Sequence, residues 1–67
     1  MKIQLNGRIV DFDQENGTID DLLSAYQLEH RVVIVEKNRE IIDKEAFKRE
    51  KIQPNDTIEI VHFVGGG

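Results

Sequence analysis

Asn6-Gly7, near the start of the chain, constrains the fold more than any other feature of the sequence. Met1–Leu5 alternate between apolar and polar side chains before this pair, and Arg8–Phe12 continue the alternation after it. An Asn-Gly pair between two alternating runs is the strongest short signal for a β-hairpin, because both residues accept the positive φ angles that a two-residue turn requires. The sequence therefore predicts that the chain begins as a tight β-hairpin.

A short amphipathic helix is predicted after the polar, turn-like residues 13–17. Thr18 can cap its N-terminus, Asp21 can complete a capping box, and Asp20 and Asp21 complement the positive end of the helix dipole. Apolar side chains follow at the spacing of one helix face: Ile19, Leu22, Leu23 and Tyr26. This face is expected to pack on a sheet, with Tyr26 at its edge.

Three further strands are predicted in the second half of the chain. Val32–Val35 is wholly β-branched, Glu40–Ile42 is a short candidate strand, and Thr57–Ile60 alternates as a final strand. Because a small domain has one helix to cover one face of its sheet, the other face of Val32–Val35 is expected to be an exposed patch or a docking surface.

The connection before the final strand is predicted to be irregular over residues 43–52, with Phe47 and Ile52 packed on the domain. Pro54-Asn55-Asp56 then indicates a turn in which Asn55 takes a positive φ. The order of elements predicts an α+β fold, a mixed sheet of four to five strands with one main helix, whose first and last strands lie parallel at the centre. This is the β-grasp arrangement.

Composition excludes several classes of function. The 67 residues make one domain, too small to enclose an active site. A net charge of −4 repels nucleic acid. The chain has no cysteine for a disulfide, a thiolate nucleophile or a thiolate metal site, and its two histidines, His30 and His62, lack a second ligand at metal-binding spacing. We therefore expect a protein that is not an enzyme and binds no metal.

The longest apolar runs, Val32–Val35 and Ile60–Val64, are too short to span a membrane, and no signal peptide is recognised. The protein is expected to be cytoplasmic, independent of membranes, and monomeric when free.

The last three residues, Gly65-Gly66-Gly67, directly follow the apolar run that ends at Val64. Glycine has no Cβ, so such a backbone can enter a slot too narrow for side chains and present an unhindered carboxylate. An extended segment from Val64 to Gly67 reaches about 13 Å. Residues 1–62 are therefore expected to form the folded domain, and residues 63–67 a flexible tail whose end is the reactive group. A frayed terminus or a cloning scar is the alternative explanation.

The sequence resembles the ubiquitin-like sulfur carriers of bacteria, and most closely the ThiS family of thiamin biosynthesis. The likeness extends over the whole chain and rests on five segments, Ile3–Gly7, Thr18–Leu23, Val33–Asn38, Asp56–Val61 and Phe63–Gly67. Two positions depart from the family pattern: Asn55 stands where glycine is common before the aspartate of the last turn, and three glycines end the chain where two are usual.

The resemblance implies chemistry at the end of the chain. Gly67 would be the reactive carboxylate and Gly66 its paired spacer, while Gly65 lengthens the reach. An adenylating enzyme of the ubiquitin-activating type would use ATP and magnesium to form an acyl-adenylate on Gly67. Sulfur from a cysteine desulfurase would then convert the terminus to a thiocarboxylate, and thiazole synthase would accept that sulfur. No cofactor would be bound by this chain itself.

Docking residues follow from strand alternation. If Ile58 and Ile60 point toward the helix, Val61 and Phe63 lie on the opposite face, beside the outward half of Val32–Val35. These residues, with Val64 and Gly65 beyond them, are expected to anchor the partner.

Three alternative functions remain open on the sequence. The first is the small subunit of molybdopterin synthase, which carries sulfur by the same terminal chemistry. The second is a ubiquitin-like tag joined to lysines through Gly67. The third is an interaction module whose tail is incidental.

Overall fold

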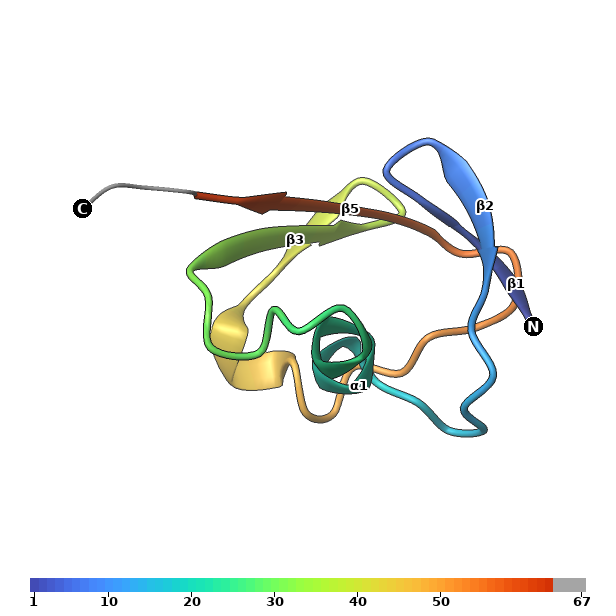
Figure 1. Ribbon diagram of the computed structural model, residues 1–67, viewed down its shortest axis with the longest axis horizontal. Coiled ribbons are helices and arrows are strands. Elements are labelled where there is room, and N and C mark those ends of the chain that lie inside the picture. Colours follow the sequence, from blue (N-terminus) through green and yellow to red (C-terminus); the bar gives the residue numbers. More distant parts are fainter. Residues whose placement is uncertain (64–67) are drawn as a thin grey trace.

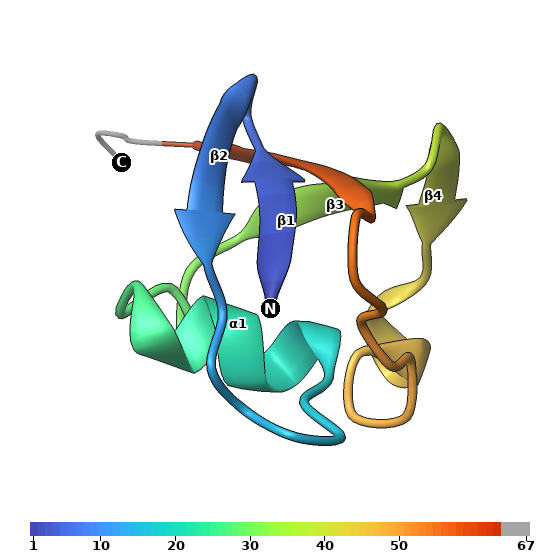
Figure 2. The same cartoon turned by 90° about the vertical axis from the view of Figure 1, so that its right-hand side faces the viewer.

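The computed structural model describes residues 1–63 and contains a sheet of five strands. Its elements in chain order are β1 (Lys2–Leu5), β2 (Arg8–Asp11), α1 (Ile19–Ala25), β3 (Val33–Lys37), β4 (Glu40–Ile42), the 3-10 helix η1 (Lys44–Ala46) and β5 (Thr57–His62). The strand order is β2-β1-β5-β3-β4. Helix α1 crosses one face of this sheet (Figures 1 and 2).

Strands β1 and β5 are parallel at the centre of the sheet, and the other neighbouring pairs are antiparallel. This confirms the predicted mixed sheet with one main helix.

Both tight hairpins turn through residues with positive φ. Asn6 and Gly7 have φ angles of 50° and 83° between β1 and β2, and Asn38 and Arg39 have 52° and 73° between β3 and β4. Positive φ at both central residues matches the right-handed twist of the strands that a two-residue turn joins. The first hairpin was predicted from Asn6-Gly7. In the second hairpin, the pairing of β3 with β4 holds Arg39 in a backbone conformation that arginine does not favour.

The predicted cap of α1 is confirmed. The Thr18 hydroxyl accepts from the Asp21 backbone N–H, and the Asp21 carboxylate accepts from the Thr18 backbone N–H at 2.9 Å. At the other end, Gln27 has a φ of 61°, and the Leu28 N–H donates to the Leu23 carbonyl at 2.8 Å. This is a Schellman arrangement with glutamine where glycine is usual, so the sequence carried no clear sign of it.

The hydrophobic core lies between α1 and the sheet. It comprises Ile3, Leu5, Phe12, Ile19, Leu22, Leu23, Val35, Phe47, Ile52, Ile58 and Ile60. These are inward positions of β1, β3 and β5, the apolar face of α1, and three residues of the connections, whereas β2 and β4 contribute only the partly buried Val10 and Ile42. Tyr26, predicted at the edge of that face, is the C-cap residue and is 47% exposed.

Residues 43–52 were predicted to be irregular, and the structure adds the single 3-10 turn η1 within them. Phe47 and Ile52 are buried as expected. The segment also supplies acceptors for the start of α1, since the N–H groups of Ile19 and Asp20 donate to the Glu50 and Phe47 carbonyls, each at 3.0 Å. Those N–H groups have no partner inside the helix, so the segment is a structural part of the helix terminus.

Gly17 permits a close contact in the turn before α1. A Cβ added there would lie 2.6 Å from two ring carbons of the buried Phe12. The Ile52 N–H also donates to the Gly17 carbonyl at 3.0 Å, which ties this turn to the later connection. Within residues 1–63, no helix has the length and apolarity needed to cross a membrane.

Candidate functional site

Strand β5 carries the chain from the sheet toward the glycines. It lies between β1 and β3 and ends at His62, at the far side of the domain from Met1 (Figure 1). Phe63 follows, and its N–H donates to the Val32 carbonyl at 3.3 Å. The predicted site residues Val64, Gly65, Gly66 and Gly67 lie outside the described residues.

The sheet face away from α1, called here the outer face, presents an apolar patch beside the end of β5. Val61 pairs with Ile34 across the β3–β5 ladder, while the preceding Ile60 pairs with Val35 on the buried face. The side chains of this outer patch are exposed to 72% at Val32, 44% at Ile34, 55% at Val61 and 57% at Phe63. Strand alternation thus places Val61 and Phe63 opposite the buried Ile58 and Ile60, as the sequence indicated.

An acidic pair lies next to the outer patch. Glu36 and Glu59 are direct partners in the β3–β5 ladder, and both line a polar hollow of about 450 Å³ together with Gln4, Asn38, Arg39 and Thr57. No ion pair joins either carboxylate to a cation among residues 1–63. Like charges directly opposite each other on a sheet are destabilising, so this pair lowers the stability of the fold, and packing of the core does not require it.

The beginning of β5 is held by a buried carboxylate. Asp56 is 8% exposed and accepts from the Gln53 N–H at 2.7 Å and from the Asn38 side-chain amide at 3.0 Å. The Asn38 side-chain oxygen in turn accepts from the Thr57 N–H at 2.9 Å. Lys37 lies within 4.0 Å of Asp56 and forms a 2.6 Å ion pair with Glu50. These contacts fix the start of β5.

The middle of β5 is held by Asn6. The Ile60 N–H donates to the Asn6 side-chain oxygen at 2.8 Å, and the Asn6 side-chain amide donates to the Ile60 carbonyl at 3.2 Å. The Asn-Gly pattern indicates Asn6 only as a turn residue and gives no sign of this contact, because the two positions are 54 residues apart. Period-two alternation could have indicated that Ile34, Glu36 and Glu59 face outward together.

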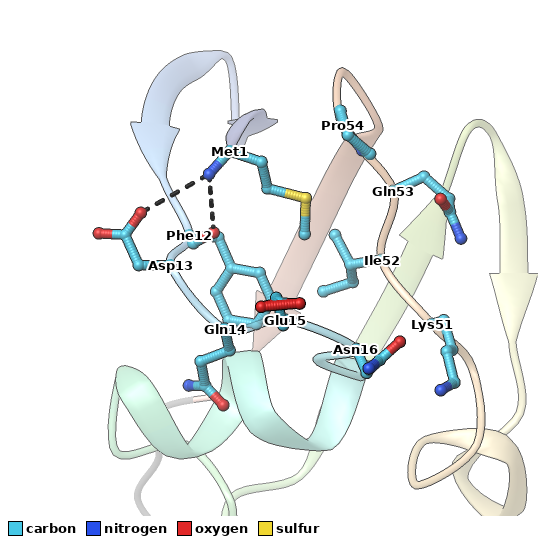
Figure 3. Close-up of a pocket in the computed structure, with 10 residues that line it drawn as sticks. All are labelled: Met1, Phe12, Asp13, Gln14, Glu15, Asn16, Lys51, Ile52, Gln53 and Pro54. Atoms are coloured by element: carbon cyan, nitrogen blue, oxygen red, sulfur yellow. Dashed lines mark hydrogen bonds and ion pairs between the residues drawn. The ribbon is translucent and has the colours of Figure 1, made fainter.

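A further hollow of about 370 Å³ lies at the other end of the domain (Figure 3). Its lining includes the N-terminal ammonium of Met1, which donates to the Phe12 carbonyl at 3.2 Å and lies 3.6 Å from an Asp13 carboxylate oxygen. These polar groups hold the N-terminus against the first hairpin. In the part of the chain that the structure describes, no group of three or more His, Cys, Asp and Glu residues is placed to hold a metal.

Comparison with known proteins gives a consistent result. The sequence model of the ThiS family matches residues 3–67. The sulfur carrier protein ThiS of Bacillus subtilis (strain 168) is 55% identical over 65 residues, which cover 97% of this chain and 98% of the relative.

A solved structure and an enzyme are also similar. The crystal structure of the thiamine biosynthesis protein ThiS from Geobacter metallireducens superposes with a TM-score of 0.82 at 32% identity, covering 100% of both chains. A thiazole synthase of Paramagnetospirillum magneticum is 36% identical over 67 residues, which cover 100% of this chain but 20% of the enzyme.

Proposed function

Because the chain belongs to the ThiS family and is a sulfur carrier of thiamin biosynthesis, we propose that the carboxylate of Gly67 is the group that carries the sulfur. The observation that supports this assignment most directly is the extent of the family match, which includes all three final glycines. The similarity to ThiS proteins does not favour the molybdopterin synthase and conjugation-tag alternatives.

The proposed reaction sequence has three steps. The ionised Gly67 carboxylate is a poor electrophile, so an adenylating enzyme joins it to the α-phosphorus of ATP and releases pyrophosphate. The terminal sulfur of a desulfurase persulfide then attacks the acyl carbon, AMP leaves, and a thiol cleaves the remaining S–S bond as it is oxidised to a disulfide. Thiazole synthase takes the sulfur from the resulting thiocarboxylate at the oxidation level of sulfide, and the oxygen of a water molecule replaces it on Gly67.

The partners supply the catalysis in this proposal. ATP and magnesium are bound by the adenylating enzyme, and this chain contributes a terminus and a docking surface without acting as an enzyme itself. The similarity of a thiazole synthase segment to the whole of this chain supports thiazole synthase as the acceptor. We place the reaction in the cytoplasm, with the free carrier as a monomer.

The outer patch is the proposed anchor for these partners. In the proposal, residues 1–62 form the domain and residues 63–67 the tail, so a partner that covers Val61 and Phe63 is already in contact with the base of the tail. Exposed apolar side chains of this kind are suitable anchors when a partner pocket removes them from water. The neighbouring Glu36 and Glu59 favour a partner that presents an arginine or lysine beside its apolar pocket.

The intact mass of the protein tests the carrier assignment. Incubation with the adenylating enzyme, ATP, magnesium, a cysteine desulfurase, cysteine and a thiol reductant should raise the mass by the exchange of one oxygen for one sulfur, and the gain should map to the C-terminal peptide. A variant with one residue added after Gly67 is the control and should gain nothing, because its side chain meets a slot that fits bare glycine backbone.

Other outcomes would contradict the proposal in distinct ways. Amide-linked conjugates to lysines would indicate a tag, and an unchanged mass would indicate an incidental tail. If the native protein, purified from its own cells, extends past Gly67, then Gly67 has no terminal carboxylate and the proposal fails. Turnover of the loaded protein by the large subunit of molybdopterin synthase, but not by thiazole synthase, would overturn the thiamin assignment.

A further inference from the structure

Strand β5 extends beyond the end of β1, its neighbour on one side. On one side it pairs with β3 from Ile58 to His62, but on the other side its ladder with β1 includes only Thr57 and Ile58. The chain turns back at Asn6 and Gly7, so β1 supplies no backbone beside the second half of β5. Without another partner, the N–H and carbonyl of Ile60 would face solvent or the hairpin tip unpaired.

The Asn6 side chain continues this ladder. The last backbone bond between the strands is from the Asn6 N–H to the Ile58 carbonyl at 2.9 Å. At the next position the side-chain amide of Asn6 takes the place of a peptide group, accepting from the Ile60 N–H at 2.8 Å and donating to the Ile60 carbonyl at 3.2 Å. An amide offers both a donor and an acceptor, whereas an ionised aspartate offers only acceptors.

Asn6 therefore has two functions at one position. Its φ of 50° suits the hairpin turn, which glycine would also satisfy, while its side chain holds β5 from the β1 side. Asn38 is a close parallel at the other end of β5. It also has a positive φ, of 52°, in a hairpin turn, and its side chain also bonds to β5, at Thr57.

We propose that Asn6 is a positioning residue for the sulfur-carrying terminus. By pairing with Ile60, it fixes the second half of β5 on both sides and sets the direction in which the chain leaves the sheet after His62 and Phe63. When the end of β5 is already fixed, less conformational freedom is lost as the tail enters the adenylating enzyme. Asn38 stabilises the same strand at its start and does not affect this direction.

This inference rests on the proposed function, and Asn6→Gly tests it. The substitution keeps a residue that accepts positive φ and removes both side-chain bonds to Ile60. The KM of the protein for adenylation should rise about three- to tenfold, because ordering of the end of β5 now opposes docking, while kcat stays within about twofold. Hydrogen exchange should be faster at the Ile60 amide, which loses its acceptor, and unchanged at Thr57.

Asn38→Gly is the matched control. It makes the same chemical change in the other hairpin and removes the side-chain bonds of Asn38 to Thr57 and Asp56. It should lower the thermal midpoint, accelerate exchange at Thr57 and leave the KM for adenylation as in the original protein. The kinetics are measured at a temperature where circular dichroism shows all proteins folded.

Each result has a defined meaning. A KM unchanged by Asn6→Gly, or raised equally by Asn38→Gly, would overturn the positioning role and leave the proposed function intact. Failure of the original protein to be adenylated would instead overturn the proposed function. If Asn6→Gly does not fold, Asn6→Asp keeps the acceptor for the Ile60 N–H and replaces the donor by a carboxylate oxygen that repels the Ile60 carbonyl. A rise in KM then supports the inference, and an unchanged KM refutes it.

Discussion

Leu22 illustrates how a single residue holds this small domain together. Its side chain is 1% exposed on the inner face of α1, between the helix and the sheet. Leu22→Ala should lower the free energy of unfolding by about 2–5 kcal/mol, because transfer energy is lost and a cavity remains. Chemical denaturation followed by circular dichroism measures this change.

An exposed position provides the control for Leu22. Ile9 is 73% exposed on β2, so Ile9→Ala should change the unfolding free energy by no more than about 0.5 kcal/mol. A cost below about 1 kcal/mol at Leu22 would mean that the helix is not the main contact of the sheet.

Asparagine occupies most of the positions in this fold where a residue other than glycine has a positive φ. Among residues 1–63, four of the six non-glycine residues with positive φ are asparagines, namely Asn6, Asn16, Asn38 and Asn55. Asparagine tolerates this conformation better than other residues with a Cβ, because its short side chain can hydrogen-bond locally. The φ of 70° at Asn55 confirms the turn predicted there and accounts for asparagine at a position where glycine would be expected.

At the scale of elements, the outer face of β5 and β3 is the proposed docking surface. Phe63→Asp should weaken binding to the adenylating enzyme, since it places a charge in a contact that is expected to be apolar, while the fold stays intact. Ile9→Asp is the control on the same face, because Ile9 is 73% exposed on the edge strand β2, which β1 separates from β5. Isothermal titration calorimetry compares the affinities of the two variants, and equal affinities would show that the interface lies elsewhere.

A charge reversal in the acidic pair should raise the stability of the protein and lower its affinity for the adenylating enzyme. Glu59→Lys replaces a like-charge pair with Glu36 by an attractive one, so the thermal midpoint should rise. Affinity for the adenylating enzyme should fall, most strongly at low salt, if a partner arginine or lysine faces this pair. Differential scanning calorimetry and titration measure the two effects. A rise in both quantities would show that the partner presents no positive charge there.

For the whole molecule, folding and carrier function should separate at the C-terminus. Among residues 1–63, all core residues lie between Ile3 and Ile60, and the described elements end at His62. Removal of Gly66 and Gly67 should therefore leave the thermal midpoint nearly unchanged and abolish ATP-dependent adenylation. A pyrophosphate-release assay and thermal denaturation test both parts, and a large loss of stability would contradict the prediction.

Local patterns in the sequence determined the elements of this protein. The turn at Asn6-Gly7, the cap at Thr18 and the apolar spacing of α1 depend on φ preferences and on neighbours a few residues away, so they can be identified without the rest of the chain. Strand alternation likewise predicted which side chains of β5 face the core. The resemblance to sulfur carriers also rested on short segments and on the final glycines.

Only the tertiary structure decided which distant groups meet. The pairing of Asn6 with Ile60 and of Glu36 with Glu59 depends on strand register, which is set by packing of the core and by turn geometry over the whole domain. The αL conformation of Gln27 and Arg39 is imposed by the same tertiary context against their residue preferences. Sequence patterns act over a few residues, whereas the direction of β5 and the surface around it depend on contacts between remote strands.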